Sequence, residues 1–325
     1  MDLLTVSRLK AFRSCARKHD LRYVKKFVPA ARKESLSIGT LFHKGLEAWW
    51  NMNDLGFALS MIAASAHQMG VDDEITVRVS EMVRGYVNSW APVRDQYEVV
   101  GVEQEFRCAL INPDTMAASH TWEIAGKLDI VLREKATGFK VLVEHKTTSD
   151  DISDDSAHYF KKLALDAQLS MYHVGGESLG HSFEKIIYDV TSKPTTKRKL
   201  ATPIEDRKYT AAGKLYANQR ETDETLTEFA ERIRADIAER PERYYRRVET
   251  VRLENEILES MRDVWHDARI IRESEIAGRA PRNPDACTQF GICEYFDVCA
   301  LGVDPEKSTM FRKLETAHPE LEFAV

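Results

Sequence analysis

The stretch that decides the fold runs from Trp122 to Thr147 and reads WEIAGKLDIVLREKATGFKVLVEHKT. Its first half alternates apolar and polar side chains, which is typical of a half-buried strand. The apolar side chains that share one parity are Ile124, Leu128, Ile130 and Leu132. Lys135 to Gly138 form a turn sequence, and residues 139–147 read as a second strand. The stretch therefore predicts a β-hairpin.

Two carboxylates face each other across the predicted hairpin. The midpoint between Asp129 and Glu144 falls inside the turn, so their Cβ atoms should lie about 4.5–5.5 Å apart. Opposed like charges destabilise a sheet unless something positive lies between them, and Lys146 shares the face of Glu144 because strand side chains alternate. A divalent cation such as Mg²⁺ takes one or two carboxylates and can activate water against a phosphodiester. The other interpretation is a polar sheet face in which Lys146 neutralises two acids.

Periodicity predicts helices before this hairpin and both kinds of element after it. We expect helices at about Ser7–Asp20, 40–51, 55–69, 74–91, 164–174, 222–239 and 249–277. We expect further strands at about 97–109 and 185–190. Residues 191–220 form a long polar connection, of the kind that is either functional or mobile. This order favours an α/β core with a helical surround.

Composition places the chain among ordinary globular proteins. It has 325 residues, of which 43% are hydrophobic and 30% charged. No apolar run approaches the roughly 18 residues that a membrane span requires, and no basic stretch followed by an apolar one marks a secretory signal at the N-terminus. Five cysteines is an odd number and fits a secreted disulfide scaffold poorly. We expect a cytoplasmic protein without a membrane partner.

The charge is distributed unevenly. The formal net charge is −6, yet residues 1–33 hold ten Lys and Arg against two Asp. A local basic stripe can bind phosphates on an acidic protein, because salt screens charges beyond about 10 Å. A second basic run extends from Lys193 to Lys199. The alternative is a solvated helix face plus a charged loop.

Four short motifs follow one another along the chain. They are Gly39-Thr40-Leu41-Phe42-His43, Gly126-Lys127-Leu128-Asp129, Glu144-His145-Lys146 and Gln168-Leu169-Ser170-Met171-Tyr172. In this order they resemble the PD-(D/E)xK nuclease superfamily, and more narrowly its RecB-type exonuclease domain, found in CRISPR-associated and phage recombination nucleases. The proline of the superfamily's name is absent, since Leu128 precedes Asp129.

The resemblance implies a fold and a set of roles. The fold would be a central mixed β-sheet, the restriction-endonuclease-like core, wrapped by N- and C-terminal helices. His43, Asp129 and Glu144 would hold Mg²⁺ or Mn²⁺. The catalytic set would be Asp129, Glu144, Lys146, Gln168 and Tyr172, with the last two sharing a helical face where they could position a phosphate or the scissile strand. The family often has a further Glu on the preceding strand, for which both Glu103 and Glu105 are candidates.

Four cysteines suggest a metal site that joins the chain ends. Cys287, Cys293 and Cys299 follow a C-x5-C-x5-C pattern, and Cys15 lies near the other end of the chain. Four thiolates satisfy either a [4Fe–4S] cluster or a tetrahedral Zn²⁺ ion. The resemblance implies the cluster, although the family's more usual tail spacing is C-x2-C-x5-C. We expect Cys108 to be a core residue.

The sequence thus predicts a metal-dependent DNA exonuclease with an iron–sulfur staple. The resemblance implies a role in DNA recombination, repair or phage DNA processing in a bacterial or phage-infected cell, with linear or single-stranded DNA as substrate and a single-strand annealing or recombination protein as partner. The expected organisation is one integrated domain with an N-terminal helical region (1–95), a nuclease core (96–220) and C-terminal helices with the cysteine tail (221–325). The alternatives are a catalytically silent DNA-binding or assembly protein of the same fold and a zinc-stapled regulatory protein.

Overall fold

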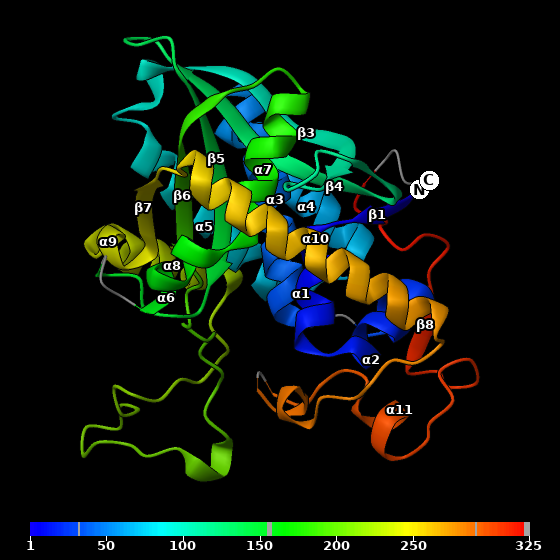
Figure 1. The fold of residues 1–325 in the computed structure, drawn as a ribbon. Coiled ribbons are helices and arrows are strands. Elements are labelled where there is room, and N and C mark those ends of the chain that lie inside the picture. The colour runs from blue at the N-terminus through cyan, green and yellow to red at the C-terminus, as the bar shows by residue number, and fades with distance from the viewer. Residues whose placement is uncertain (32, 155–157, 290, 322–325) are drawn as a thin grey trace.

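The computed structural model describes residues 1–31, 33–154, 158–289 and 291–321 (Figure 1). The main sheet contains β1 (Asp2–Leu4), β3 (Tyr97–Ile111), β4 (Ala118–Glu134), β5 (Lys140–Thr148), β6 (Phe183–Ser192) and β7 (Tyr245–Thr250), while β2 (Phe27–Pro29) pairs with β8 (Phe311–Lys313). The helices are α1 (Val6–Ser14), α2 (Ala16–His19), α3 (Glu34–Met52), α4 (Leu55–Met69), α5 (Asp73–Trp90), α6 (His158–Lys161), α7 (Ala167–Ser178), α8 (Leu226–Glu239), α9 (Pro241–Tyr244), α10 (Glu254–Ile276) and α11 (Phe296–Ala300).

The main sheet is mixed, as the sequence predicts. Its order is β1-β4-β5-β6-β7, and β3 pairs with the other edge of β4. The β1–β4 and β5–β6 pairs are parallel, whereas β3–β4, β4–β5 and β6–β7 are antiparallel. The α/β class with helices around a mixed sheet is therefore confirmed. The short strands β1 and β7 are additions that the sequence did not predict.

The register of the central hairpin is also as predicted. Ile130 pairs with Val143 and Leu132 with Val141, which places Asp129 opposite Glu144. The pairing of β4 with β5 ends at Ile130, so the two strands separate just before these carboxylates. The backbone N–H of His145 donates instead to Asp129 Oδ2 at 2.8 Å. The site thus occupies an opening in the sheet.

The expected single apolar face of β4 is wrong. Ile130 and Leu132 pack in the cluster beneath α3 and α5, whereas Leu128 packs with Val131 and with Tyr172 of α7. The strand therefore changes the face of its apolar side chains between Leu128 and Ile130. Directly opposite this point, Glu103 on β3 has a φ of +50°, a left-handed backbone conformation that breaks regular alternation.

Helices cover both faces of the sheet (Figure 1). On one face α3, α4, α5 and α8 enclose a large aromatic core that includes Trp50, Tyr86 and Trp90. On the other face lie α7 and the long α10, which runs diagonally across the front of the view. The helices expected at 55–69 and 74–91 are confirmed, while α3 begins six residues before residue 40. No helix in the described part of the chain is long and apolar enough to cross a membrane.

The first helix differs from its prediction. Thr5, and not Ser7, caps α1 by accepting a hydrogen bond from the backbone of Arg8 at 3.2 Å. The expected continuous helix to Asp20 is interrupted at Cys15, whose backbone is extended at φ −163° and ψ 118°. This break turns Cys15 toward the C-terminal tail, where its sulfur accepts from the backbone of Asn283 at 3.4 Å.

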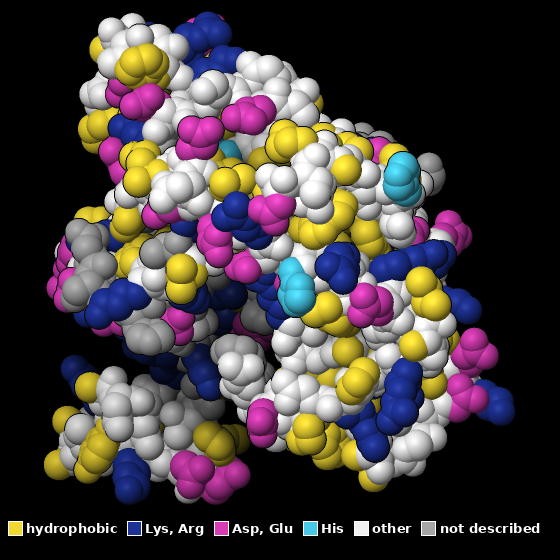
Figure 2. All heavy atoms as spheres, viewed as in Figure 1, with side chains coloured by type: hydrophobic (Ala, Val, Ile, Leu, Met, Phe, Trp, Pro, Cys, Tyr) yellow, Lys and Arg dark blue, Asp and Glu magenta, His cyan; other side chains and the backbone are white. Residues whose placement is uncertain are grey.

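The long polar connection after β6 is an arm that leaves the body of the protein. We define the arm as residues 193–224, which contain no α-helix or named strand. Figure 1 shows it as the yellow-green excursion at the lower left, and Figure 2 shows hydrophobic, Lys or Arg, and Asp or Glu side chains on its surface. The sequence predicted the irregular connection, but not that it would extend away from the sheet.

Candidate metal centre and active site

Three side chains from three elements converge at the opening between β4 and β5. His43 Nδ1 of α3 lies 3.9 Å from Glu103 Oε1 of β3 and 3.8 Å from Asp129 Oδ2 of β4. One ligand atom from each lies within 4.8 Å of the others, and this is the only such group of His, Cys, Asp and Glu among the described residues. Two carboxylates and an imidazole suit a divalent cation such as Mg²⁺ or Mn²⁺.

The structure separates the two candidate glutamates on β3. Glu103 lies opposite Asp129, and its left-handed backbone is a strained conformation of the kind that is retained at functional sites. Glu105 lies opposite Lys127 and pairs with it at 3.2 Å. Glu103 therefore belongs to the group of candidate metal ligands and Glu105 does not. The register of the β3–β4 hairpin is the signal that distinguishes them, since it places only Glu103 across from Asp129.

Glu144 lies beside this group and not within it. Its side chain is buried, and Oε1 accepts from Gln168 Nε2 at 2.6 Å and from Lys146 Nζ. Oε2 is buried without a hydrogen-bond partner among the described residues. Burial, followed by repulsion from Asp129, raises the pKa of Glu144 to about 7. This oxygen has no hydrogen-bond partner and lies near three candidate ligand side chains. A bound cation would give it a partner.

The charges around the opening favour a bound cation. Burial alone would lower the pKa of Lys146, but Glu144 and Asp129 outweigh it and raise that pKa, so the ammonium stays charged. Burial likewise opposes protonation of His43, yet Asp129 and Glu103 raise its pKa. Burial raises the pKa of Asp129. The acids thus lie near positive groups, and burial raises the pKa of Asp129 and Glu144 above the usual values. Both effects are expected where carboxylates gather, and a bound cation would favour their ionised forms.

The Gln168 and Tyr172 pair turns inward and positions Glu144. Both side chains are buried on α7, and Gln168 Nε2 also donates to Tyr172 Oη at 3.0 Å. The sequence suggested that they could hold a phosphate, but their polar atoms bind Glu144 and each other. A Cβ on Gly126 would lie 2.8 Å from the ring of Phe106 and 3.3 Å from that of Tyr172. The glycine of the Gly126–Asp129 motif therefore leaves room for these rings.

Sequence reasoning missed His145, the residue between Glu144 and Lys146. It is buried, and burial holds its pKa well below the usual value, so the ring is neutral. Tyr86 Oη accepts from Trp50 Nε1 at 3.0 Å and lies 2.8 Å from His145 Nε2. Nδ1 of the same ring lies 3.7 Å from Asp129 Oδ2. No motif spacing marks this contact, because Tyr86 lies on α5.

The basic N-terminal segment is largely occupied by internal ion pairs. Its cations pair with acids of the same segment, of α10 and of the region around α7 and the tail; these pairs are Arg8–Glu275, Lys10–Asp166, Arg13–Asp267, Arg17–Asp20, Lys18–Glu294 and Lys25–Asp20. Arg32, another cation of the segment, lies outside the described residues. The segment joins the two ends of the chain, which weakens the expectation that its cations help to hold DNA.

The four cysteines of the predicted metal staple lie together. Cys15, Cys287, Cys293 and Cys299 all line one cavity of about 30 Å³. The neighbouring strands β2 and β8 also bring the two chain ends into contact. Cys108 lies apart on β3, opposite Ile124, as a partly buried residue against the core.

Comparison with known proteins agrees with this geometry. A sequence model described as the PD-(D/E)XK nuclease superfamily matches residues 3–300. No curated protein matches the chain. The match spans the opening at Asp129 and all four clustered cysteines. Members of this superfamily are metal-dependent nucleases that act on DNA. The chain belongs to the PD-(D/E)XK nuclease superfamily.

Proposed function

We propose that the protein is a divalent-metal-dependent deoxyribonuclease of the RecB type that degrades DNA from its ends. The observation that carries the proposal is the convergence of His43, Glu103 and Asp129 next to Glu144, whose orphaned oxygen and Lys146 neighbour complete the site. A binding protein without catalysis has no need of all these groups in one opening. The four motifs of the RecB-type domain support action on DNA ends in recombination, repair or phage DNA processing.

Each residue has a proposed task in hydrolysis. His43, Glu103 and Asp129 would hold Mg²⁺ or Mn²⁺, which supplies an activated water and neutralises charge on the phosphate. Lys146 is about one-third exposed and charged, so it can stabilise the charge that develops on the phosphate. Gln168 holds the Glu144 carboxylate in place. His145 fixes Asp129 through its backbone N–H.

We further propose that the four clustered cysteines hold a [4Fe–4S] cluster. All four line one small cavity. The resemblance to the RecB-type domain favours a cluster over a single Zn²⁺ ion, and the cluster would join both ends of the chain and stabilise the fold directly.

The test is cleavage of end-labelled DNA. Linear and circular DNA, with each strand end labelled separately, is incubated with Mg²⁺, Mn²⁺ or EDTA. We expect shortening of linear DNA with either metal, none in EDTA, and none in Asp129→Ala, Glu144→Ala or Lys146→Ala protein with unchanged circular dichroism. Cleavage of circular DNA would reject the requirement for ends, and no cleavage of any DNA would favour the catalytically silent alternative.

A matched pair on β3 tests the metal group itself. Glu103→Gln should lose cleavage, because it removes one of the three ligands. Glu105→Gln lies two residues away on the same strand and should retain cleavage, since Glu105 pairs with Lys127 outside the group. The reverse outcome would exchange the roles of the two glutamates.

A further inference from the structure

The arm arises at the edge of the active site. Its first residue, Lys193, donates its backbone N–H to Thr148 at the end of β5, and Thr148 follows Lys146 by two residues. The side chain of Lys193 also donates to the carbonyl of Ser35, at the start of the helix α3 that carries His43. The root of the arm therefore lies at the edge of the active site, and the rest of the arm extends away from the sheet from there (Figure 1).

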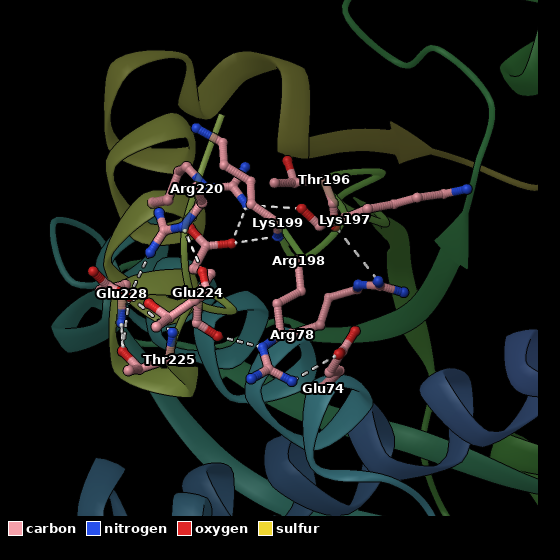
Figure 3. A network of polar contacts seen from close by, with 12 residues as sticks. Glu74, Arg78, Thr196, Lys197, Arg198, Lys199, Arg220, Glu224, Thr225 and Glu228 are labelled. Atoms are coloured by element: carbon pink, nitrogen blue, oxygen red, sulfur yellow. Dashed lines mark hydrogen bonds and ion pairs between the residues drawn. The ribbon is translucent and has the colours of Figure 1, made fainter. Parts of the chain in front are cut away.

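The base of the arm is fixed by a buried ion pair. Glu224 is only 2% exposed and accepts from Arg232 of α8 through both oxygens, at 2.8 and 2.7 Å. Its Oε2 also accepts from the backbone of Lys199 at 2.8 Å, and Arg198 donates to Glu74 of α5 at 3.3 Å (Figure 3). The bonds from Arg232 are the largest cause that lowers the pKa of Glu224 to about 2. The two ends of the arm, at Arg198 and at Glu224, are thus bound to α5 and α8.

Beyond this base, residues 202–220 fold back on themselves as a hairpin, which we call the tongue. Thr202 donates to the carbonyl of Arg220 at 2.9 Å, and Tyr216 donates to that of Lys208 at 3.0 Å. Tyr209 pairs with Leu215 in an antiparallel bridge. None of the hydrophobic clusters of the described residues includes a residue of the arm. A two-stranded hairpin is marginally stable alone, so one that exposes apolar side chains is suited to binding a partner.

The surface of the tongue combines cations with an aromatic ring. The arm contains eight Lys and Arg against five acids, of which Glu224 is buried in the ion pair at the base. Lys197, Lys199, Lys208 and Lys214 are exposed, and none forms an ion pair with a described residue. The N-terminal segment differs in this respect, because six of its cations pair with acids of the protein. The tongue is therefore a basic surface that is available to phosphates.

The pairing within the tongue places these groups on one face. Lys208 lies opposite Tyr216 and Thr210 opposite Lys214, so Lys208, Lys214 and Tyr216 share a face of the tongue. The opposite face carries Tyr209 and Leu215. Tyr216 is 45% exposed between two lysines. A ring on which a base can stack, flanked by cations for the backbone, is how proteins bind single-stranded nucleic acid without reading its sequence.

We propose that the face formed by Lys208, Lys214 and Tyr216 binds single-stranded DNA that extends outward from the active site. This inference rests on the proposed function, because it assigns the arm to the same substrate. The arm holds the strand outside the opening, so that long DNA binds more tightly than DNA too short to reach the tongue. Since Tyr216 lies on an arm that packs on no cluster of the core, its loss leaves the fold and the chemistry of bound DNA unchanged.

The test measures binding in the absence of cleavage. Full-length Asp129→Ala protein is titrated with a fluorescent thymine oligonucleotide of about 30 nucleotides, roughly twice the longest common site size, and with one of about 6. We expect Tyr216→Ala to weaken binding of the long oligonucleotide about fivefold or more, since one stacked base contributes that much or more. Lys208→Ala with Lys214→Ala should reduce the slope of log affinity against log salt by about 1.4. The short oligonucleotide should bind each variant equally.

Tyr209→Ala is the matched control, because Tyr209 lies on the opposite face of the same tongue. Equal weakening by Tyr209→Ala and Tyr216→Ala, or none by either, would overturn the proposed face. A protein that sediments as a dimer and becomes a monomer in Tyr216→Ala would also overturn it and assign the tongue to a second copy. The proposed function is judged separately with wild-type protein on the short oligonucleotide. If the short DNA is cut while Tyr216→Ala leaves long DNA unaffected, only the arm proposal fails.

Discussion

Metal binding to this site should release protons, and Glu144 should account for a defined share of them. Burial and the neighbouring Asp129 raise the pKa of Glu144 to about 7 in the metal-free protein. A divalent cation close to Oε2 reverses this effect, because it favours the ionised carboxylate. A carboxyl with a pKa of about 7 is protonated to about 0.9 at pH 6, about 0.5 at pH 7 and about 0.1 at pH 8. These fractions are the protons that Glu144 gives up when the metal binds.

The perturbation is Glu144→Gln, which keeps the size and the hydrogen-bond acceptor but cannot titrate. Calorimetric titration with Mn²⁺, in buffers of equal pH and different ionisation enthalpy, counts the released protons. His43 contributes in both proteins, because its acidic neighbours raise its pKa against the effect of burial. The difference between wild type and variant should therefore be about 0.9, 0.5 and 0.1 proton at pH 6, 7 and 8. Equal proton counts at all three values would refute the reasoning, since Glu144 would then be ionised before the metal binds.

The remaining predictions concern metal ligation, the staple and the space around the motif glycine. His43→Ala should weaken Mn²⁺ binding measured by calorimetry, because it removes one of the three candidate ligands. Unchanged Mn²⁺ affinity would mean that His43 is a structural residue and not a ligand. Protein purified without air should be brown with about four iron atoms per chain, and Cys15→Ser should remove the colour while Cys108→Ser keeps it; zinc without iron would favour the rival ion. Gly126→Ala should lower both cleavage and the free energy of unfolding, the latter by about 1–3 kcal/mol, because the added Cβ meets the ring of Phe106. An unchanged melting temperature would contradict that contact.

Local patterns in the sequence predicted the centre of the fold well. The turn at Lys135–Gly138 and the alternation on either side set the register that places Asp129 opposite Glu144. The strand β7 was missed because Tyr245–Thr250 is short and carries charged side chains on a solvated edge. The reversal of face at Asp129 was missed as well, since it depends on the left-handed backbone of Glu103 on another strand.

Contacts between residues far apart in the chain could not be predicted from charge alone. The excess of cations in residues 1–33 is visible in the sequence, but their partners Asp267 and Glu275 follow more than 230 residues later on α10. The same composition fits a DNA-binding face and an internal ion-pair network equally well. Only the packing of α1 against α10 distinguishes these two possibilities. Because that packing uses the N-terminal cations internally, the second basic run at Lys193–Lys199 and the arm that it begins are the better candidates for binding DNA.

The ion pairs between the chain ends also determine what the cysteine staple can stabilise. Arg8 is buried and pairs with Glu275 at 2.8 Å, and its guanidinium lies over the ring of Trp122 on β4. The connection of α1 to α10 and to the sheet thus exists without any cysteine. Among the described residues beyond Ile276, a small hydrophobic cluster forms in which Tyr295 packs with Phe27 and Phe311. The proposed metal staple at Cys15 would therefore stabilise this tail more than the nuclease sheet, and we expect loss of colour to be separable from loss of cleavage.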